Sequence, residues 1–463
     1  MGLPTPIGRQ RDVLYLPVDG HFVVLGTAGS GKTTLAILRS AYLAHQDTKG
    51  GGPTLLVTFN RALVAYLKHL RDPSLTSVTV ENYHKFARGY LASIGRIGSN
   101  TICGPEQKAD LITQVVKSFS ANGKQSAVLS REPAFFESEI EWIERHGITL
   151  LREYLSAERV GREAALDTKS RGLVFQIYKI YLDARKAAGK EYDWDDLASA
   201  VCEGLAADDS PRRYKHVVID EGQDFSPQMI RSLAAAIPND GSLTFFGDMA
   251  QQIYGRRLSW KSAGLNVGKV WQFKENYRNT RQITALGLAI SRMPYFKDTP
   301  DMVEPITPKA DGPLPALVHC DTVSKEMQIL KEFVTNASKT QTIAVLFRRR
   351  ETEAIIKQVL PRGAIRLHRE LTTWQSGPRT YYGTYHAAKG LEFDTVFLPF
   401  LSEDNLPDPK EIQTYGIEEA RRGDGKLLYV GVTRAKTRLI MTFSGRNTSL
   451  LPSEDSLYQK QNG

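Results

Sequence analysis

The sequence predicts an α/β protein with two parallel-sheet domains and a block of helices inserted in the first. Three observations predict this class. The apolar run at 22–25 passes through a glycine-rich turn into a helical pattern, similar apolar runs recur along the chain and end in polar residues, and helical patterns replace strand patterns over 88–200. Strands that alternate with helices favour a parallel sheet, and ligands bind at the edge where such strands end.

The composition fits a chain of two or three folded domains. Its 463 residues are 41% hydrophobic and 24% charged, and 60 basic against 51 acidic residues give a net charge of +9. This excess suits a polyanionic partner but does not identify one. No apolar run reaches the roughly 18 residues that a membrane span needs. The N-terminal segment lacks the pattern of a secretory signal, and the three cysteines have no metal or disulfide spacing, so we expect a cytoplasmic setting.

The turn after the first strand has the residues that a nucleoside triphosphate needs. Its glycines let successive backbone N–H groups and the N-terminus of the next helix face one anion. Lys32 adds a charge for the outer phosphates, and Thr33 offers a hydroxyl to Mg²⁺. The expected binding residues are Gly26, Gly29, Ser30, Gly31, Lys32 and Thr33. The alternative is a simple glycine-rich turn, and the loop alone names no reaction because several enzyme classes share it.

Other residues near this edge are candidates for reading bases. Gln10 lies upstream of the loop, and a glutamine amide can both donate to and accept from an adenine edge. The apolar runs at 54–59 and 78–80 predict two further strands, with Phe59 and His84 at or just beyond their ends. These aromatic groups could stack on bases, although core packing is the alternative.

The pattern over 88–200 predicts a helical insertion, with amphipathic runs at 106–120, 134–146 and 171–188. The second run contains four glutamates interleaved with apolar residues. They are Glu137, Glu139, Glu141 and Glu144. We interpret them as the solvated face of a helix rather than as a metal or acid cluster.

Two acidic residues follow the buried strand predicted at 216–219. Asp220 would hold Mg²⁺, and Glu221 would polarise the water that attacks the γ-phosphorus. A solvated acidic turn is the alternative. The next strand, at 243–246, is followed by Gln251, a candidate sensor of the γ-phosphate.

The second half contains three more apolar runs, at 315–318, 342–346 and 364–367, which predict a second sheet. The expected division of the chain is therefore 1–87 and 201–272 for the first sheet domain, 88–200 for the helical insertion and 273–463 for the second sheet domain.

Six segments together resemble the ordered motif series of UvrD/Rep-like superfamily 1 helicases. They are 26–33, 220–224, 247–254, 275–280, 384–393 and 428–436. The resemblance spans nearly the whole chain and is weakest in the helical insertion. It implies two RecA-like P-loop NTPase domains, use of ATP and Mg²⁺, and translocation along single-stranded DNA.

The resemblance also assigns residues in the second half. Tyr277 would stack on adenine, and Glu392 would contact the ribose or the nearby nucleotide network. Arg278 and Arg434 would reach the γ-phosphate from the second domain, where they stabilise charge only when the domains close. With Gln251, the expected catalytic set is Lys32, Asp220, Glu221, Gln251, Arg278 and Arg434. The expected DNA face is Phe59, His84, Tyr254, Trp260 and His386.

Three features depart from the family pattern. Thr34 stands where the family often has arginine, and Arg256 stands where a base-stacking tryptophan is usual, with Trp260 four residues later. The segment from Arg281 to Gly383 has only 103 residues, too few for the large helical insertion of the full-length helicases.

These features leave three interpretations open. The first is a DNA-dependent ATPase that acts as a translocase or helicase on single-stranded or forked DNA. The second is a DNA-sensing ATPase that licenses a partner nuclease or other effector, as family members in phage-defence systems do. The third is an ATPase that remodels a polymerase. Unwinding of a forked duplex by the isolated chain separates the first interpretation from the other two.

Overall fold

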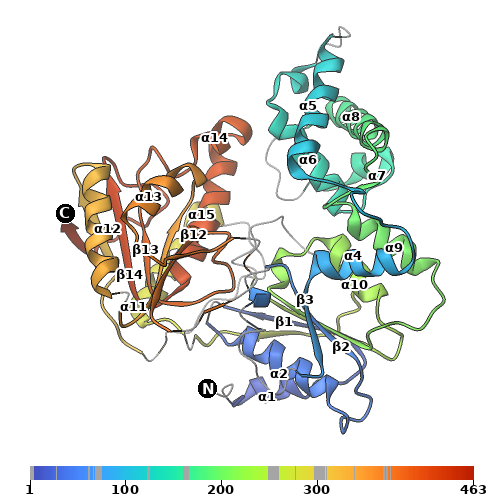
Figure 1. Cartoon of the computed structure of the whole chain (residues 1–463), viewed down its shortest axis with the longest axis horizontal. Helices are drawn as coiled ribbons and strands as arrows, with labels where there is room; N and C mark the ends of the chain where they lie inside the picture. The colour runs from blue at the N-terminus through green and yellow to red at the C-terminus, as the bar shows by residue number, and fades with distance from the viewer. Residues whose placement is uncertain are drawn as a thin grey trace.

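The computed structural model confirms the predicted class, with two parallel α/β sheets and a helical body (Figure 1). It describes residues 5–463 except for a set of positions and the side chains of 120 and 121. The excepted positions are 28, 61–62, 66, 68–75, 122–125, 160–165, 249–259, 277, 297–307, 309, 338, 369–370, 372–373 and 376. Among the described helices, none combines the length and apolar character that crossing a bilayer requires.

The first sheet has the strand order β3-β2-β6-β7-β1-β8, and all its pairs are parallel. Its strands are β1 (Gly20–Gly26), β2 (Thr54–Thr58), β3 (Val78–Asn82), β6 (His216–Asp220), β7 (Ser242–Gly247) and β8 (Val270–Phe273). The register aligns Thr58 with Asp220 and Leu25 with Gly247. The glycine-rich loop, Phe59, Glu221 and Asp248 therefore all follow strand ends at one edge of the sheet.

Helices cover both faces of the first sheet, because its strands are apolar on both sides. On one face lie α1 (Arg9–Leu14) and α2 (Lys32–Ala44), and on the other lie α4 (Tyr83–Ser93), α9 (Leu197–Ala206) and α10 (Pro227–Ala235). Alternate residues of β1 enter the two cores: Val23 and Leu25 one, Val24 the other. This is the burial expected for a parallel sheet between helical layers.

The helical body stands above α4, α9 and α10 in Figure 1 and has its own apolar core. It consists of α5 (Pro105–Ala121), η2 (Ala127–Ser130), α6 (Pro133–Arg145), α7 (Leu151–Ser156) and α8 (Thr168–Ala187). The chain enters and leaves it side by side, where β4 (Ile102–Cys103) pairs in parallel with β5 (Tyr192–Asp193).

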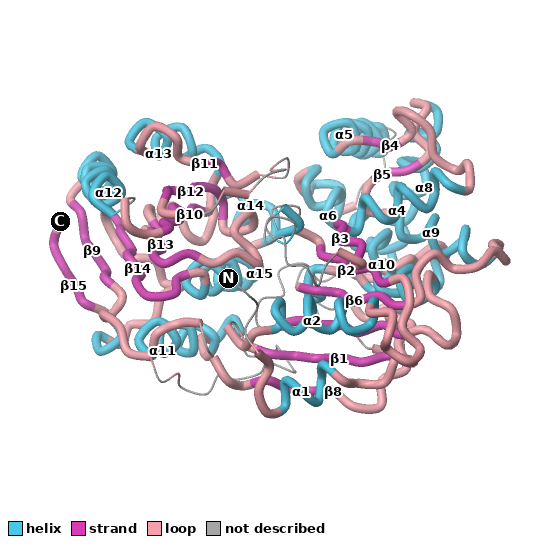
Figure 2. Tube along the Cα trace, turned by 60° about the horizontal axis from the view of Figure 1, so that its bottom comes forward, coloured by secondary structure: helices cyan, strands magenta, loops and turns pink. Residues whose placement is uncertain are grey.

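The second sheet has the order β11-β12-β10-β13-β14-β9-β15, again with parallel pairs (Figure 2). Its strands are β9 (Ala316–Cys320), β10 (Thr342–Phe347), β11 (Ile365–Arg366), β12 (Arg379–Thr384), β13 (Phe393–Leu398), β14 (Ala435–Ser444) and β15 (Gln459–Asn462). Its helical elements are α11 (Arg281–Ser291), η5 (Pro294–Phe296), α12 (Val323–Ala337), η6 (Arg350–Thr352), α13 (Glu353–Val359), α14 (Pro409–Tyr415), α15 (Ile417–Thr433) and η7 (Asp455–Leu457).

The described residues of the segment 281–383 form strands and helices of this second unit, from α11 to β12, and the loops between them. It contains no separate helical body among those residues. We propose the division at 87/88, 200/201 and 272/273. The first two boundaries lie within α4 and α9, which pack in the core of the first sheet.

Candidate active site

The glycine-rich loop joins the end of β1 to the start of α2. Gly29 and Gly31 have φ values of +79° and +83°, in the left-handed region that favours glycine. A Cβ on Gly29 would collide with the Asn276 side chain, and one on Gly26 would collide with the Ser30 hydroxyl. The loop therefore needs glycine both for its turn and for the close approach of neighbouring groups.

Lys32 begins α2 and is buried. Its Nζ donates to the carbonyl oxygens of Gly26 at 2.8 Å and Thr27 at 2.6 Å, and lies 3.8 Å from Asp248 Oδ2. Burial lowers the pKa of Lys32, while the charges of Asp248 and Glu221 act in the opposite direction. The ammonium group is thus a buried cation held by the loop's own carbonyls and by the acids at the next strand ends.

Asp220 ends β6 and is buried. Neither of its carboxylate oxygens accepts a hydrogen bond of ordinary geometry from the described residues. Burial and the neighbouring Glu221 raise the pKa of Asp220 to about 7, and the Thr33 hydroxyl acts in the opposite direction. A buried carboxylate whose oxygens accept no hydrogen bond of ordinary geometry within the described part of the chain is a candidate ligand for a cation. With the Thr33 hydroxyl it forms the set of hard oxygen ligands that Mg²⁺ prefers, so these two residues fit the expected metal.

Glu221 adopts φ of +52°, a conformation that is uncommon for residues other than glycine. Its carboxylate accepts a hydrogen bond from Gln223 Nε2. Burial alone would raise the pKa of Glu221, but nearby positive charges, chiefly Arg434 and Lys32, hold it below its ordinary value. The two adjacent acids therefore differ: burial and its neighbour favour the protonated form of Asp220, and surrounding cations keep Glu221 ionised.

Two arginines from the second half approach these acids. Arg434 follows α15, is buried, and donates to the carbonyl oxygens of Val430 at 3.2 Å and Leu391 at 3.3 Å. Burial and the charge of Arg278 lower the pKa of Arg434, and Glu221 opposes this shift. The charge of Arg278 also lowers the pKa of Lys32. The charge of Arg278 thus acts on both Lys32 and Arg434, and this concentration of positive charge favours an anionic ligand beside them.

Glu392 lies beside these arginines. It forms an ion pair with Arg278, and its Oε2 lies 3.8 Å from Lys436 Nζ. Its side chain is 35% exposed. Glu392 is therefore positioned here as a partner of Arg278, next to the cations.

An amide cluster that sequence reasoning missed fixes the segment carrying Arg278. Asn276 Nδ2 donates to Asn279 Oδ1 at 2.9 Å and to Thr284 Oγ1 at 3.1 Å. Asn279 Nδ2 donates to the carbonyl oxygens of Thr433 at 3.2 Å and Ala435 at 2.5 Å. These bonds tie the segment to the end of α15, and the two asparagines of the 275–280 motif were the signal that could have indicated them.

The adenine-reading candidates are only partly described. Gln10, in α1, donates through Nε2 to the carbonyl oxygen of Ser30 at 3.4 Å, and its Oε1 accepts from the backbone of Ile7 at 3.2 Å. It therefore contacts the glycine-rich loop directly. Tyr277 and Gln251 lie outside the described residues.

The structure brings together two of the five DNA-face candidates. The rings of Phe59 and His84 meet edge to face with centroids 5.5 Å apart. His84 also meets Trp194, at 5.2 Å. Sequence reasoning missed Trp194. The signal that could have indicated it is a tryptophan within the polar run 192–196, which otherwise contains one tyrosine and three aspartates.

The other three candidates have different positions. Trp260 packs edge-on against Phe245, at 5.0 Å, in the core of the first sheet. His386 is partly buried on the turn that follows β12 in the second unit. Tyr254 lies outside the described residues.

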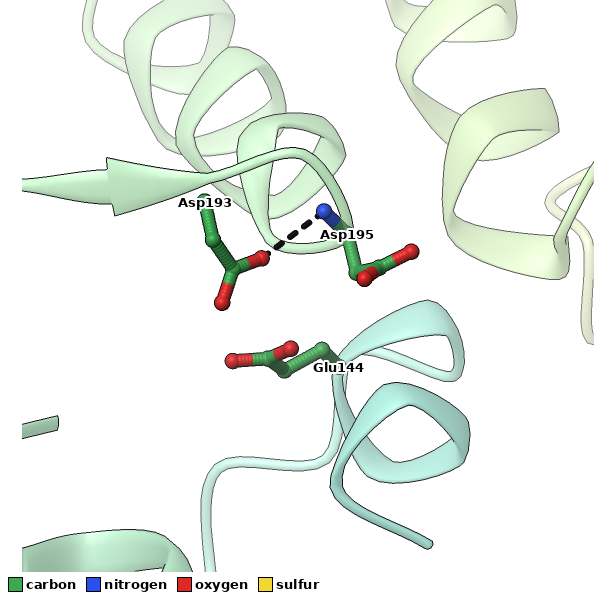
Figure 3. A group of neighbouring side chains, drawn as sticks. All are labelled: Glu144, Asp193 and Asp195. Carbon is green, nitrogen blue, oxygen red and sulfur yellow. Dashed lines mark hydrogen bonds between the residues drawn. The ribbon is translucent and has the colours of Figure 1, made fainter. Parts of the chain in front are cut away.

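Three carboxylates far from the loop have the spacing of a metal site: Glu144, Asp193 and Asp195 (Figure 3). However, Lys108 Nζ lies among them, at 2.7 Å from Glu144, 3.1 Å from Asp193 and 2.9 Å from Asp195. The ammonium group of Lys108 lies among these acids, and Arg145 and Arg185 also pair with Asp195 and Asp193, so they form an ion-pair cluster and not a vacant cation site.

The interpretation of the four glutamates as a solvated helix face is wrong for two of them. Glu139 and Glu144 are 0% and 2% exposed. Glu139 accepts hydrogen bonds from Tyr154 at 2.5 Å and from Arg159 at 2.6 Å, and Glu144 pairs with Lys108. Their partners lie on other elements, so the helical pattern of α6 alone gave no sign of them.

Comparison with known proteins agrees with this geometry. Residues 8–269 match the family model for the UvrD/REP helicase N-terminal domain, and residues 369–446 match the UvrD-like helicase C-terminal domain. A probable DNA helicase of Mycoplasma pneumoniae is 23% identical over 91% of this chain and 80% of its own length. The ATP-dependent DNA helicase UvrD2 of Mycobacterium tuberculosis is 23% identical over 94% of this chain and 78% of its own length. The first family model alone spans more than half of the sequence, and the chain therefore belongs to the UvrD/Rep family of ATP-hydrolysing DNA helicases.

Proposed function

We propose that this chain is a Mg²⁺-dependent ATPase whose turnover is stimulated by single-stranded DNA, and that it uses this turnover to move along the strand. The observation that carries the proposal is the convergence of Lys32, Glu221 and Arg434 at one strand edge. The first two come from the first sheet and the third from the second unit. Hydrolysis would thus depend on how the two units approach each other.

The nucleotide would be held by the loop and α2. The backbone N–H groups of the loop would bind the phosphates. The ammonium of Lys32 would bind them too, and would exchange its hydrogen bonds to the loop carbonyls for bonds to phosphate oxygens. Asp220 and Thr33 would hold Mg²⁺. The bound ion would place positive charge beside the phosphate groups whose connecting bond is cleaved. Gln10, which contacts the loop, would read the base.

Glu221 would orient the attacking water and accept its proton, because surrounding cations keep its carboxylate ionised. Arg278 and Arg434 would stabilise the charge that develops on the transferred phosphoryl group. Since Arg434 is carried by the second unit, it acts only when that unit is closed on the first. A DNA strand that favours closure would therefore raise the rate.

The test is the rate of ATP hydrolysis with and without an oligothymidylate, at low and at moderate salt. The expected result is stimulation by the oligonucleotide that declines as salt rises, because phosphate contacts release counterions. Omission of Mg²⁺ should abolish turnover. A rate indifferent to DNA at low salt would contradict the proposal.

One observation also favours a protein partner. The described residues between α11 and β12 contain no separate helical body that could grip a duplex. We therefore propose that duplex processing depends on a partner, such as a nuclease for which this ATPase acts as the DNA sensor. Co-purification of the chain with such a nuclease, and loss of nuclease activity when Lys32 is replaced, would support this role over independent unwinding.

A further inference from the structure

A buried ion pair joins the two units beside the candidate active site. Lys389 lies on the turn after β12 in the second unit, and Asp224 lies in η3 (Gly222–Asp224) of the first. Their Nζ and Oδ1 atoms are in contact, and the two side chains are only 3% and 2% exposed. Neither residue belongs to the set that the proposed hydrolysis uses.

Two further contacts fix this crossing point. Asn60 Nδ2, from the first unit, donates to the carbonyl oxygen of Lys389 at 2.5 Å. Gly390 has φ of +76°, and a Cβ there would lie 2.8 Å from Leu63 Cδ2 and 3.5 Å from Glu221 Oε1. The turn of the second unit is thus pressed against the first unit, next to the candidate catalytic acid.

The Lys389–Asp224 ion pair lies between the DNA-face candidates and the acids of the nucleotide site. Asn60 is adjacent to Phe59, and the backbone N–H of Lys389 donates to the carbonyl oxygen of His386 at 3.3 Å. Phe59 and His386 are candidates for the DNA face, one in each unit. On the other side, Asp224 ends the short segment that starts from Glu221. One turn therefore connects a DNA-face candidate directly with the acids of the nucleotide site.

We propose that Lys389 is a positioning residue that couples DNA occupancy to the nucleotide site through its ion pair with Asp224. The proposal rests on the proposed function, since it concerns how the two ligands of that ATPase affect each other. Lys389 acts through Asp224 and the backbone beside Glu221, without touching the reacting atoms.

A buried ion pair between two units is suited to this role because it is nearly all-or-none. When the units separate fully, water hydrates both charges, whereas a charge that stays buried without its partner is strongly unfavourable. The pair therefore favours either full closure or full opening. A strand bound at Phe59 and His386 would shift the balance between these two states, and the nucleotide site would respond.

The experiment measures coupling between ligands. The affinity of a fluorescent oligothymidylate is determined by anisotropy with and without a non-hydrolysable ATP analogue and Mg²⁺, for the unmodified chain and for Lys389→Met, Asp224→Asn, the double variant and Lys389→Arg. The ratio of the two affinities is the coupling factor, and it should be at least about fivefold in the unmodified chain. It should fall to near one in Lys389→Met and Asp224→Asn, and be largely restored in Lys389→Arg.

The double variant keeps the test decisive if a single variant folds poorly, because it leaves no unpaired buried charge. Its coupling factor should equal that of either single variant. Arg159→Met with Glu139→Gln is the matched control, since it removes a buried ion pair within the helical body and should leave coupling unchanged. The same preparations are assayed for DNA-stimulated hydrolysis.

Two failures can be told apart. If the unmodified chain shows neither coupling nor stimulation of hydrolysis by DNA, the proposed function fails, and the coupling role of Lys389 fails with it. If hydrolysis by the unmodified chain is stimulated but Lys389→Met and the double variant retain its coupling factor within about twofold, only the coupling role of the ion pair is overturned.

Discussion

Lys32 and Glu221 have different roles in the proposed hydrolysis: Lys32 binds the phosphates, and Glu221 accepts a proton from the attacking water. Each also affects the pKa of the other. Lys32→Ala removes a phosphate-binding cation, so it should weaken ATP binding and abolish turnover. Glu221→Gln keeps the size of the side chain but cannot accept a proton, so it should still bind ATP while turnover falls by about 100-fold or more. Calorimetric titration with ATP together with turnover assays checks this, and an equal loss of ATP affinity in both variants would overturn the assigned roles.

A second residue-scale prediction concerns His216 in β6, which is buried and contacts the Ser242 hydroxyl at 2.9 Å and the Gly50 carbonyl at 3.2 Å. Burial lowers its pKa to about 4. As pH falls below about 6.5, the unfolded chain takes up this proton first, so the free energy of unfolding should decrease by up to about 1.4 kcal/mol per pH unit.

His216→Gln removes the titrating group, so its stability deficit relative to the unmodified chain should be smaller at pH 5 than at pH 7. Urea denaturation at the two pH values measures this difference. A deficit of the same size at both would show that His216 does not titrate as described.

At the scale of elements, the helical body is fastened at its base by charge. Lys108 in α5 meets Glu144 of α6 and the two aspartates that flank the end of β5. Arg185 in α8 pairs with Asp193 at 3.0 Å. Because three helices and the returning strand share these ion pairs, the cluster sets the position of the body on α9 and α4.

Lys108→Met should therefore destabilise the helical body, because removing one partner leaves several buried acids uncompensated, a loss of about 3–5 kcal/mol for a broken buried pair. Limited proteolysis and thermal denaturation would show it as earlier cleavage and melting. Lys117→Met, on an exposed position of the same helix, is the control. Since Lys108 takes the place of a cation, EDTA should leave the melting temperature of the unmodified chain unchanged; a marked decrease with EDTA would revive the metal interpretation of this cluster.

At the scale of the whole molecule, the two sheets meet at the edges where their strands end, and the helical body stands on the first of them (Figures 1 and 2). The cations of the second unit reach the acids of the first across this junction. This arrangement is the one that the proposed motor needs, in which the two halves would close on a nucleotide. Among the described residues, only the body at 102–193 stands apart from the sheets.

The isolated chain should hydrolyse ATP and translocate, yet separate long duplexes poorly. The reason is the length of the segment from Arg281 to Gly383, which contributes strands to the second sheet and is too short to hold in addition a helical block of domain size, roughly 150 residues. A single-turnover unwinding series with duplexes of increasing length tests this. Efficient separation of long duplexes by the chain alone would refute the dependence on a partner.

The sequence by itself determined the parallel sheets, the glycine-rich loop and the grouping of the loop with Asp220 and Glu221. These features follow from local patterns: apolar runs define strands, and parallel strands place their ends at one edge. The other strands were not predicted: β4, β5, β8 and β12 to β15. Most of their runs are brief or interrupted by polar residues, and 384–393 and 428–436 were assigned as motifs rather than as strands.

The tertiary structure alone decided which charges are paired. Lys389 meets Asp224, 165 residues earlier, and Lys108 meets Asp195, 87 residues later. The glutamates at 139 and 144 turned out buried for the same reason. Periodicity shows which face of an element is apolar, but a charge becomes tolerable inside only when a partner on another element neutralises it. That partner is specified by how the elements pack, and no local pattern contains it.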